Sequence, residues 1–401
     1  MTNSKYINTL NIVYLGSSGS LFGSASGLKA RLIARALIAE NVNVTIVSKS
    51  WNDSNKGISF VGDTLENEGI AYCRVASELS RPSNIVKRNL LKYLLFIREF
   101  TELKRINKLM SIDAGILVTR SFISMLFYRF VSKILCFSLV INYMEYGSAM
   151  VTRNKFSQKV NDYFYERFTF KLVDAALPIS EVLKNLILNV NRDLPVLKTP
   201  VLVDMNCFQK DLPKWDYKYF LFCGAAAFIE IIDFIIKSFE LVSSKDIKLH
   251  LNCFGSPKEI MTLNDRISRS DKSKLIIFTS KLKYNDLINH YKSAIALLIP
   301  LRPTLQDKAR FPHKIGEYAA SGRPIISNNI GEMAYYFIDG KSALLADSYE
   351  FESFRDKMNF VINYPKEADR IGNEGRSVAE ENFSYKMFGK GLREFLINIK
   401  N

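Results

Sequence analysis

The sequence predicts an α/β protein with two domains, each built on a parallel sheet. The chain has 401 residues, which is more than one hydrophobic core usually serves. Short apolar runs alternate with segments of helical spacing in both halves of the chain. Between the halves, residues 202–217 lose this pattern and contain Asp, Pro, Lys and Trp. We therefore expect one domain on each side of this stretch, with the ligand in a cleft at the carboxyl ends of the two sheets.

The two halves repeat one order of elements, in which an apolar run is followed by a segment of helical spacing. This alternation is typical of a parallel sheet covered by helices on both faces. In the first half, strands are expected at residues 10–15, 42–47, 70–75, 114–118, 139–143 and 175–179, and a helix at residues 28–38. In the second half, strands are expected at residues 220–223, 248–254, 275–278, 295–299 and 324–327, and a helix at residues 314–320.

One apolar stretch, residues 122–141, raises the question of a transmembrane segment. Arg129 and Lys133 lie near its middle, and each would cost about 2.5–3.5 kcal/mol inside a bilayer. We therefore expect a buried helix followed by a buried strand.

The composition limits the classes of partner and site. The net charge is +15 and favours anionic partners, but no recognition motif for nucleic acid accompanies it. The five cysteines have no paired spacing, and the three histidines have no carboxylate or cysteine at ligand spacing, so we expect no protein-ligated metal. The first residues lack the pattern of a secretion signal, and we expect a cytoplasmic protein.

Residues 81–110 concentrate positive charge. Apolar residues recur there every three or four positions, which predicts a basic amphipathic helix. Two interpretations stay open: a surface helix with a solvated basic face, or a peripheral contact with an anionic membrane. The stretch holds eight cations, Arg81, Lys87, Arg88, Lys92, Arg98, Lys104, Arg105 and Lys108, against two acids, Glu99 and Glu102.

The most specific stretch is residues 307–326, in which a polar loop leads into a helix that ends before a buried strand. A helix N-terminus offers N–H groups and a favourable dipole to phosphate. Arg310 and Lys314 add positive charge, and an ionised Glu317 can accept two hydrogen bonds from ribose hydroxyls. These features suit a nucleotide diphosphate. The alternative is a capped surface helix with a solvated lysine and glutamate.

Two further places could contribute to a site. The loop at residues 16–27 lacks the spacing of a dinucleotide-binding fingerprint, but Gly23, Ser24 and Gly27 could bring backbone N–H groups close to phosphate. A flexible turn is the alternative there. Glu145 follows the strand expected at residues 139–143, where it could act as a base or stabilise a developing positive charge, or be an ordinary acid at a strand end.

The stretch at residues 307–326 resembles the C-terminal signature of the retaining glycosyltransferases of family 4, the glycosyl transferases group 1. The shared pattern is Arg-Phe-Pro-x-Lys, then Glu-Tyr, small residues, Gly-Arg-Pro and aliphatic residues. The resemblance covers nearly the whole chain. It extends to Leu177–Ser180, Pro200–Asp204, Asp286–Tyr291, Asn329–Glu332 and Asp339–Leu345.

This resemblance implies two Rossmann-like domains facing a central cleft, the GT-B type of fold. It implies an acceptor-binding domain at residues 1–205, a nucleotide-sugar domain at residues 206–380, and a C-terminal helix at residues 381–401 that packs back toward the first domain. The activity it implies is sugar transfer, with retention, from a UDP-type or GDP-type donor to a saccharide or lipid-linked saccharide, as in surface polysaccharide assembly. No cofactor besides the donor is expected.

The resemblance also assigns roles to residues. Glu317 matches the second glutamate of the family's pair, which is expected on the ribose, whereas Ala309 stands at the position of the first. Arg310 and Lys314 would address the diphosphate or the sugar. The turn after the first strand of the second domain, at Gly224, lacks the basic pair that the family usually places there.

Gly331, in the matched segment Asn329–Glu332, is expected near the donor. The missing glutamate and the missing basic pair keep a second interpretation open. In that interpretation the chain is a glycosyltransferase-like subunit, or a sugar-nucleotide binding protein, without catalysis.

Overall fold

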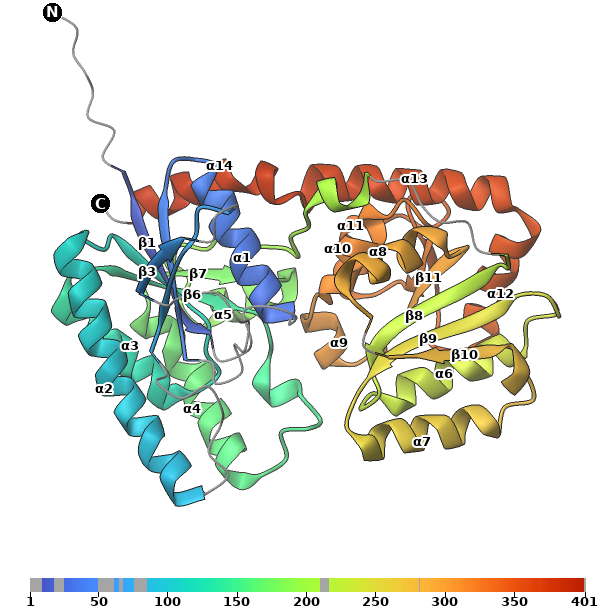
Figure 1. Ribbon diagram of the computed structural model, residues 1–401, viewed down its shortest axis with the longest axis horizontal. Helices are drawn as coiled ribbons and strands as arrows, with labels where there is room; N and C mark the ends of the chain where they lie inside the picture. Colours follow the sequence, from blue (N-terminus) through green and yellow to red (C-terminus); the bar gives the residue numbers. More distant parts are fainter. Residues whose placement is uncertain are drawn as a thin grey trace, which may run out of the picture. The chain divides into compact units, whose positions relative to one another are not determined.

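The computed structural model divides the chain into two compact units. Unit 1 comprises Met1–Leu202 and Tyr385–Asn401, and unit 2 comprises Val203–Ser384 (Figure 1). The cleft that the sequence predicts between two domains stays a prediction. The structure describes residues 9–17, 25–49, 61–64, 68–75, 85–209, 216–280 and 282–399.

Unit 1 contains a seven-stranded sheet in the order β3-β4-β2-β1-β5-β6-β7. All its pairs are parallel except the edge pair β3 and β4. The six predicted strands are confirmed, and the short edge strand β3 was missed. The strands are β1 (Asn11–Ser17), β2 (Asn43–Ser48), β3 (Val61–Thr64), β4 (Ala71–Arg74), β5 (Ala114–Leu117), β6 (Ser138–Tyr143) and β7 (Ala175–Pro178).

Helices cover both faces of this sheet. Right-handed crossovers place α1, which precedes β2, on one face and α2, α3 and α4 on the other, because the chain moves in opposite directions along the sheet. The C-terminal helix α14 packs against α1, and a side chain at Gly389 would come within 2.3 Å of the Ala36 carbonyl oxygen. The helices are α1 (Ala25–Ile38), α2 (Ile85–Leu109), α3 (Phe122–Leu135), α4 (Phe156–Leu172), α5 (Glu181–Val190) and α14 (Tyr385–Asn398).

The prediction of a buried helix in the first part of residues 122–141 holds for one face of α3 and is wrong for the other. Met125, Tyr128 and Val131 of α3 are buried, but Phe130 and Ile134 are exposed. The strand that follows, β6, is buried as expected. Within the described part of the chain, no helix is both long and apolar enough to cross a membrane.

Unit 2 contains a six-stranded, all-parallel sheet in the order β10-β9-β8-β11-β12-β13. From β8 the chain moves outward to β10, then returns to the other side of β8 and moves outward again to β13. The strand order therefore reverses between β8 and β11. The strands are β8 (Tyr219–Ala225), β9 (Lys248–Phe254), β10 (Ile276–Thr279), β11 (Ala296–Ile299), β12 (Ile325–Asn328) and β13 (Leu344–Ala346).

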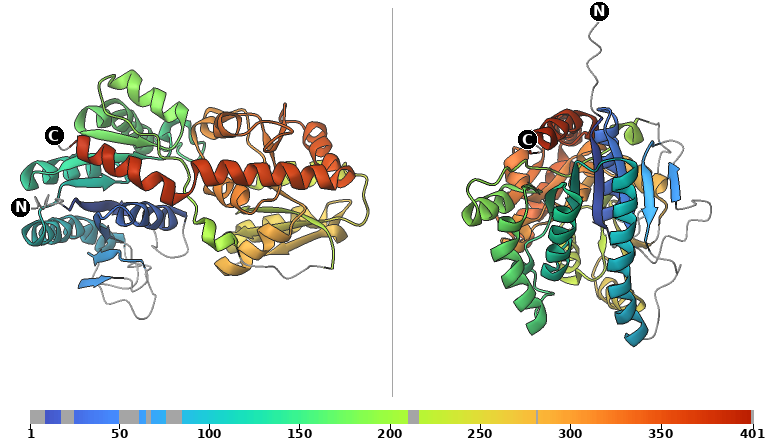
Figure 2. Two further views of the ribbon diagram at one scale, coloured as in Figure 1. Left: turned by 90° about the horizontal axis from the view of Figure 1, so that it is seen from above. Right: turned by 90° about the vertical axis from the view of Figure 1, so that its left-hand side faces the viewer.

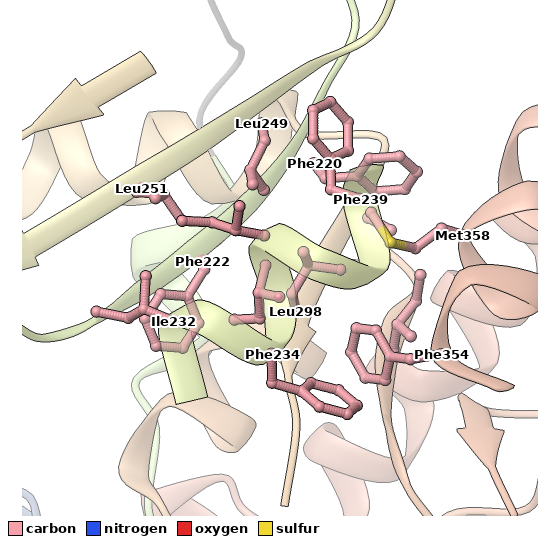
Figure 3. Close-up of a cluster of buried hydrophobic side chains, with 14 of the residues drawn as sticks. Phe220, Phe222, Ile232, Phe234, Phe239, Leu249, Leu251, Leu298, Phe354 and Met358 are labelled. Atoms are coloured by element: carbon pink, nitrogen blue, oxygen red, sulfur yellow. The ribbon is translucent and has the colours of Figure 1, made fainter. Parts of the chain in front are cut away.

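The core of unit 2 lies between the sheet and two of its helices. Phe220 and Leu249 of the sheet, Phe239 of α6 and Phe354 of α12 belong to one buried cluster (Figure 3). Near-continuous apolar strands such as β8 are typical of sheets buried on both faces. The helices are α6 (Ile229–Glu240), α7 (Pro257–Ser268), α8 (Tyr284–Ser293), α9 (Leu305–Ala309), α10 (His313–Ala320), α11 (Gly331–Tyr336), α12 (Phe351–Asn363) and α13 (Pro365–Asn382).

Candidate functional site

The reversal of strand order places a candidate ligand site in unit 2. In open α/β sheets, ligands bind outside the carboxyl ends of the strands where the order reverses, which here is the ends of β8 and β11. Each helix that follows a parallel strand runs back along the sheet, so α6, α10 and α11 all begin at this edge. Their N-terminal N–H groups and dipoles favour an anionic ligand there.

A buried aspartate organises two arginines at this edge. The Asp307 side chain is 0% exposed and lies 3.0 Å from Nε of Arg302 and 3.0 Å from Nε of Arg310. It also accepts a hydrogen bond of 2.8 Å from the backbone N–H of Arg302. Hydrogen bonding to Asp307 raises the pKa of Arg302. One carboxylate therefore fixes two guanidinium groups beside the end of β11, and Nη1 of Arg302 also pairs with Glu230 of α6 at 3.3 Å.

Arg302 and the role of Asp307 were missed by the sequence analysis. The helix α9 was also missed, because its five residues are too few to show a period. Thr304 caps α9 by accepting a hydrogen bond from the Asp307 N–H at 3.3 Å. A threonine three positions before an acid is a helix-start signal, and it could have located this turn.

Glu317 on α10 is 7% exposed, so the alternative of a solvated glutamate was wrong. Its Oε1 accepts a hydrogen bond from the Tyr284 hydroxyl at 3.1 Å, and its Oε2 accepts one from the Tyr291 hydroxyl at 3.2 Å. Burial raises the pKa of Glu317, while the charge of Lys314 and the two tyrosines oppose that rise. An ionised carboxylate has about four lone-pair sites, which leaves acceptor capacity for ribose hydroxyls.

The helix α10 is tied to the end of β8 through Tyr318 in its second turn. The Cys223 N–H donates a hydrogen bond of 3.1 Å to the Tyr318 hydroxyl. The half-buried Lys314 is close enough for its charge to oppose the rise that burial causes in the pKa of Cys223. Lys314 and Glu317 are thereby held beside the carboxyl end of the central strand.

Two glycines of the predicted site lie at the same edge. At Gly224, which ends β8, an added Cβ would approach the Phe222 ring to 2.6 Å. Gly331 begins α11 with φ of 56°, a backbone conformation that favours glycine, and an added Cβ would lie 3.0 Å from the Lys308 carbonyl oxygen. Close packing therefore explains both glycines without a ligand, and contact with a donor stays a prediction.

The predicted residues of unit 1 are only partly described. Gly27 is buried in the first turn of α1, whereas Gly23 and Ser24 lie outside the described residues. Glu145 follows β6, is 45% exposed, and lies 2.5 Å from Nη1 of Arg120, which follows β5. Because both strands end at the carboxyl edge of the sheet, this ion pair lies at the edge where the sequence analysis expected a site.

A neighbouring carboxylate of unit 1 was missed. Glu166 on α4 accepts hydrogen bonds from the Ser148 N–H at 2.8 Å and the Ser148 hydroxyl at 2.6 Å. Burial raises the pKa of Glu166. The contact joins residues 18 positions apart, and nothing in the local sequence pattern points to it.

Comparisons with known proteins agree with this fold. Residues 206–378 match the family of glycosyl transferases group 1. A sucrose-phosphate synthase from Thermosynechococcus elongatus is similar in structure, with a TM-score of 0.77 at 13% identity over 97% of this chain and 99% of that one. The Anabaena protein HepE, solved in complex with UDP and glucose, has a TM-score of 0.70 at 13% identity over 97% of this chain and 100% of that one.

The match to a curated relative covers a smaller part of both chains. An uncharacterised glycosyltransferase of Methanocaldococcus jannaschii is 22% identical over 250 residues, and the match spans 62% of this chain and 65% of that protein. The α/β fold of GT-B type is thus confirmed by the solved structures, and the match of residues 206–378 agrees with the expectation of a glycosyltransferase.

Proposed function

We propose that this protein transfers a sugar from a nucleotide-diphosphate sugar to a saccharide or lipid-linked saccharide acceptor. One observation carries the proposal. At the carboxyl edge of the unit 2 sheet, Arg302 and Arg310 are fixed by the buried Asp307, and the helix α10, which begins at His313, carries Lys314 and Glu317. A site of this charge and geometry suits a diphosphate and a ribose.

Leaving-group stabilisation is the chemistry these residues can supply. When the glycosidic bond to the donor breaks, negative charge develops on the diphosphate, and positive groups already fixed in place lower the energy of that state. In the proposal, Arg310 and Lys314 bind the diphosphate, and Glu317 accepts hydrogen bonds from the ribose. The donor is of UDP or GDP type, and no further cofactor is proposed.

Three finer points belong to the same proposal. Transfer proceeds with retention at the anomeric carbon, as the resemblance to family 4 implies. The acceptor binds to unit 1, where Glu145 serves as a base or stabilises positive charge. The product contributes to a surface polysaccharide that is built at the inner face of the cytoplasmic membrane.

Calorimetry tests the donor site. UDP, GDP, ADP and CMP are titrated into the full chain, into Glu317→Gln and into Arg310→Ala. We expect one diphosphate to bind selectively and each substitution to weaken it about tenfold or more, since a hydrogen bond to a charged group contributes about 1.5–3 kcal/mol. Arg269→Ala, at an exposed position directly after the end of α7, is the matched control and should bind as the wild type does. Binding that neither substitution changes would refute the site.

The second candidate function is a subunit that binds the sugar nucleotide without transferring the sugar. Ala309 favours it, because the side chain is buried and carries no carboxylate. Release of UDP or GDP from the sugar nucleotide, measured with a coupled assay and a panel of lipid-linked acceptors, separates the two. Binding without release over the whole panel would favour the subunit.

A further inference from the structure

Exposed apolar side chains of unit 1 are concentrated on three helices. Among the described residues, twelve of the 22 large hydrophobic side chains that are exposed lie between residues 94 and 164, and unit 1 has only one other, Met387. The twelve are Leu94, Ile97 and Leu109 of α2, Ile123, Leu126, Phe130 and Ile134 of α3, Val151, and Phe156, Val160, Tyr163 and Phe164 of α4. Single exposed hydrophobic residues are ordinary, but a contiguous patch marks an interaction site.

The centre of the patch is the outer face of α3. Leu126, Phe130 and Ile134 follow one another at intervals of four, so they form one stripe along the helix, and Phe130 is 61% exposed. The opposite face is buried against the unit. A helix that is apolar on all sides is usually buried on all sides. In α3, one apolar face is buried and the other is exposed to solvent.

The neighbouring helices extend this face on both sides. Figure 2 shows α2, α3 and α4 side by side. Phe96 of α2 packs on Phe127 of α3 with 4.6 Å between ring centroids, and Phe122 of α3 stacks on Phe164 of α4 at 5.8 Å. Phe156, in the first turn of α4, is 83% exposed. The three helices therefore form one surface, here called the α2–α4 surface.

The charge of this surface has one sign. The three helices contain twelve Lys or Arg and four Asp or Glu, and no acid among their described side chains is exposed. Two of the acids, Glu99 and Asp162, are buried, and Glu102 is paired with Arg105. The exposed cations are Arg98, Lys104, Arg105, Lys108, Lys133, Lys159, Arg167 and Lys171.

We propose that the α2–α4 surface docks on an anionic lipid bilayer. The α3 stripe enters the boundary between headgroups and acyl chains, and the cations of α2 and α4 lie over anionic headgroups. A second copy of this chain fits the surface less well, because it would bring two sets of cations together. The proposal moves the membrane contact from the basic helix that the sequence indicated to α3, which the sequence analysis expected to be buried. The proposal rests on the exposed side chains of the α2–α4 surface and is independent of the proposed sugar transfer.

Vesicle sedimentation with the full chain tests the proposal. The vesicles are phosphatidylcholine alone or phosphatidylcholine with phosphatidylglycerol. The test variant is Phe130→Glu with Ile134→Glu, and the matched control is Met261→Glu with Tyr364→Glu, two exposed apolar positions of unit 2. We expect the wild type and the control to bind the anionic vesicles alike and the test variant to bind about tenfold or more weakly.

A charge variant examines the electrostatic part separately. Lys104→Gln with Lys108→Gln should weaken binding to the anionic vesicles about fivefold for each charge removed and leave the weak binding to phosphatidylcholine unchanged. Circular dichroism and thermal melting check that each variant is folded, and the milder pair Phe130→Ser with Ile134→Ser replaces the glutamates if they disturb folding.

Three results would overturn the proposal. The first is that the wild type fails to bind anionic vesicles, and the second is that the test variant binds them as well as the wild type does. The third is that the wild type does not bind vesicles but forms a dimer in sedimentation velocity, and that the test variant does not form this dimer. The last result would assign the surface to a second copy. Nucleotide calorimetry on the test variant should match the wild type, so failure of the donor site and failure of the membrane contact are told apart.

Discussion

The carboxyl edges of the two sheets are built differently. In unit 2, buried acids fix the polar groups: Asp307 is 0% exposed and Glu317 is 7% exposed. In unit 1, the corresponding polar pair, Glu145 and Arg120, is 45% and 53% exposed. Buried and paired groups hold one geometry, which suits an invariant ligand part such as a nucleotide diphosphate. Exposed groups can rearrange at little cost, which suits an acceptor that varies. Substitutions should separate the two edges by their effect on stability.

The largest effect is expected at Asp307. Asp307→Ala leaves two guanidinium groups beside an apolar side chain, and removing one partner of a buried ion pair costs about 3–5 kcal/mol. Urea denaturation should show this loss in the free energy of unfolding. The control is Asp265→Ala, which breaks an exposed pair on α7 and should cost about 1 kcal/mol or less. Equal losses in the two variants would mean that the edge of unit 2 is not a buried site.

A smaller effect is expected at Tyr291. Tyr291→Phe removes the hydroxyl that donates to Oε2 of Glu317 and leaves a buried acceptor with one partner fewer, at a cost of about 1–3 kcal/mol. Nucleotide affinity should fall as well, because Glu317 loses a contact that holds its orientation. Tyr335→Phe, on an exposed side chain of α11, is the control. A variant that loses neither stability nor affinity would show that this hydroxyl does not hold Glu317.

Glu317 itself should combine higher stability with weaker binding. Burial raises the pKa of Glu317 in the folded state above its value in the unfolded chain. The free energy of unfolding is therefore lower at pH values above the folded-state pKa than at pH values below the unfolded-state pKa. Stability is lost as the pH rises between the two. Glu317→Gln removes this dependence and should raise the free energy of unfolding at pH 8 by about 1 kcal/mol, while nucleotide binding weakens. Denaturation at pH 5 and pH 8 checks the sign. A variant that is less stable than the wild type at pH 8 would contradict it.

The smallest effect on stability is expected at Glu145. Glu145→Gln breaks an exposed ion pair and should change the free energy of unfolding by about 1 kcal/mol or less. Sugar transfer should fall by a factor of about 100 or more if Glu145 is the base, since general base catalysis contributes about that much. Steady-state kinetics at saturating donor separate kcat from the acceptor KM. Unchanged kcat would leave Glu145 as an acid that only pairs with Arg120.

The parts of the fold that the sequence predicted are those with a local signal. Apolar runs bounded by turns located the strands at residues 114–118 and 248–254, and the spacing of three and four in residues 81–110 predicted α2. The edge strand β3 and the five-residue helix α9 lack such a signal because they are short. The apolar run at residues 122–141 predicted burial, but hydrophobicity alone does not tell which face of a helix has a partner.

In the candidate site, too, the residues with a local sequence signal were predicted and those without one were not. Arg310, Lys314 and Glu317 lie within one stretch of eight residues, so composition and the family pattern were enough to single them out. Their partners come from distant positions: Tyr284 is 33 residues before Glu317, and Tyr291 is 26 residues before it. Only the packing of α8 beside α10 brings these hydroxyls to the carboxylate. The sequence therefore predicted the charge of the site and not the contacts that fix it.

Hydrogen–deuterium exchange with saturating UDP or GDP tests the central claim most directly. If the edge of unit 2 binds the diphosphate, the nucleotide should slow exchange in residues 302–317, which contain α9 and the start of α10, and at the first turn of α6. The same experiment on Arg310→Ala should lose this protection while exchange in the core strand β9 stays unchanged. Protection confined to unit 1, or none in residues 302–317 for the nucleotide that calorimetry selects, would contradict the account.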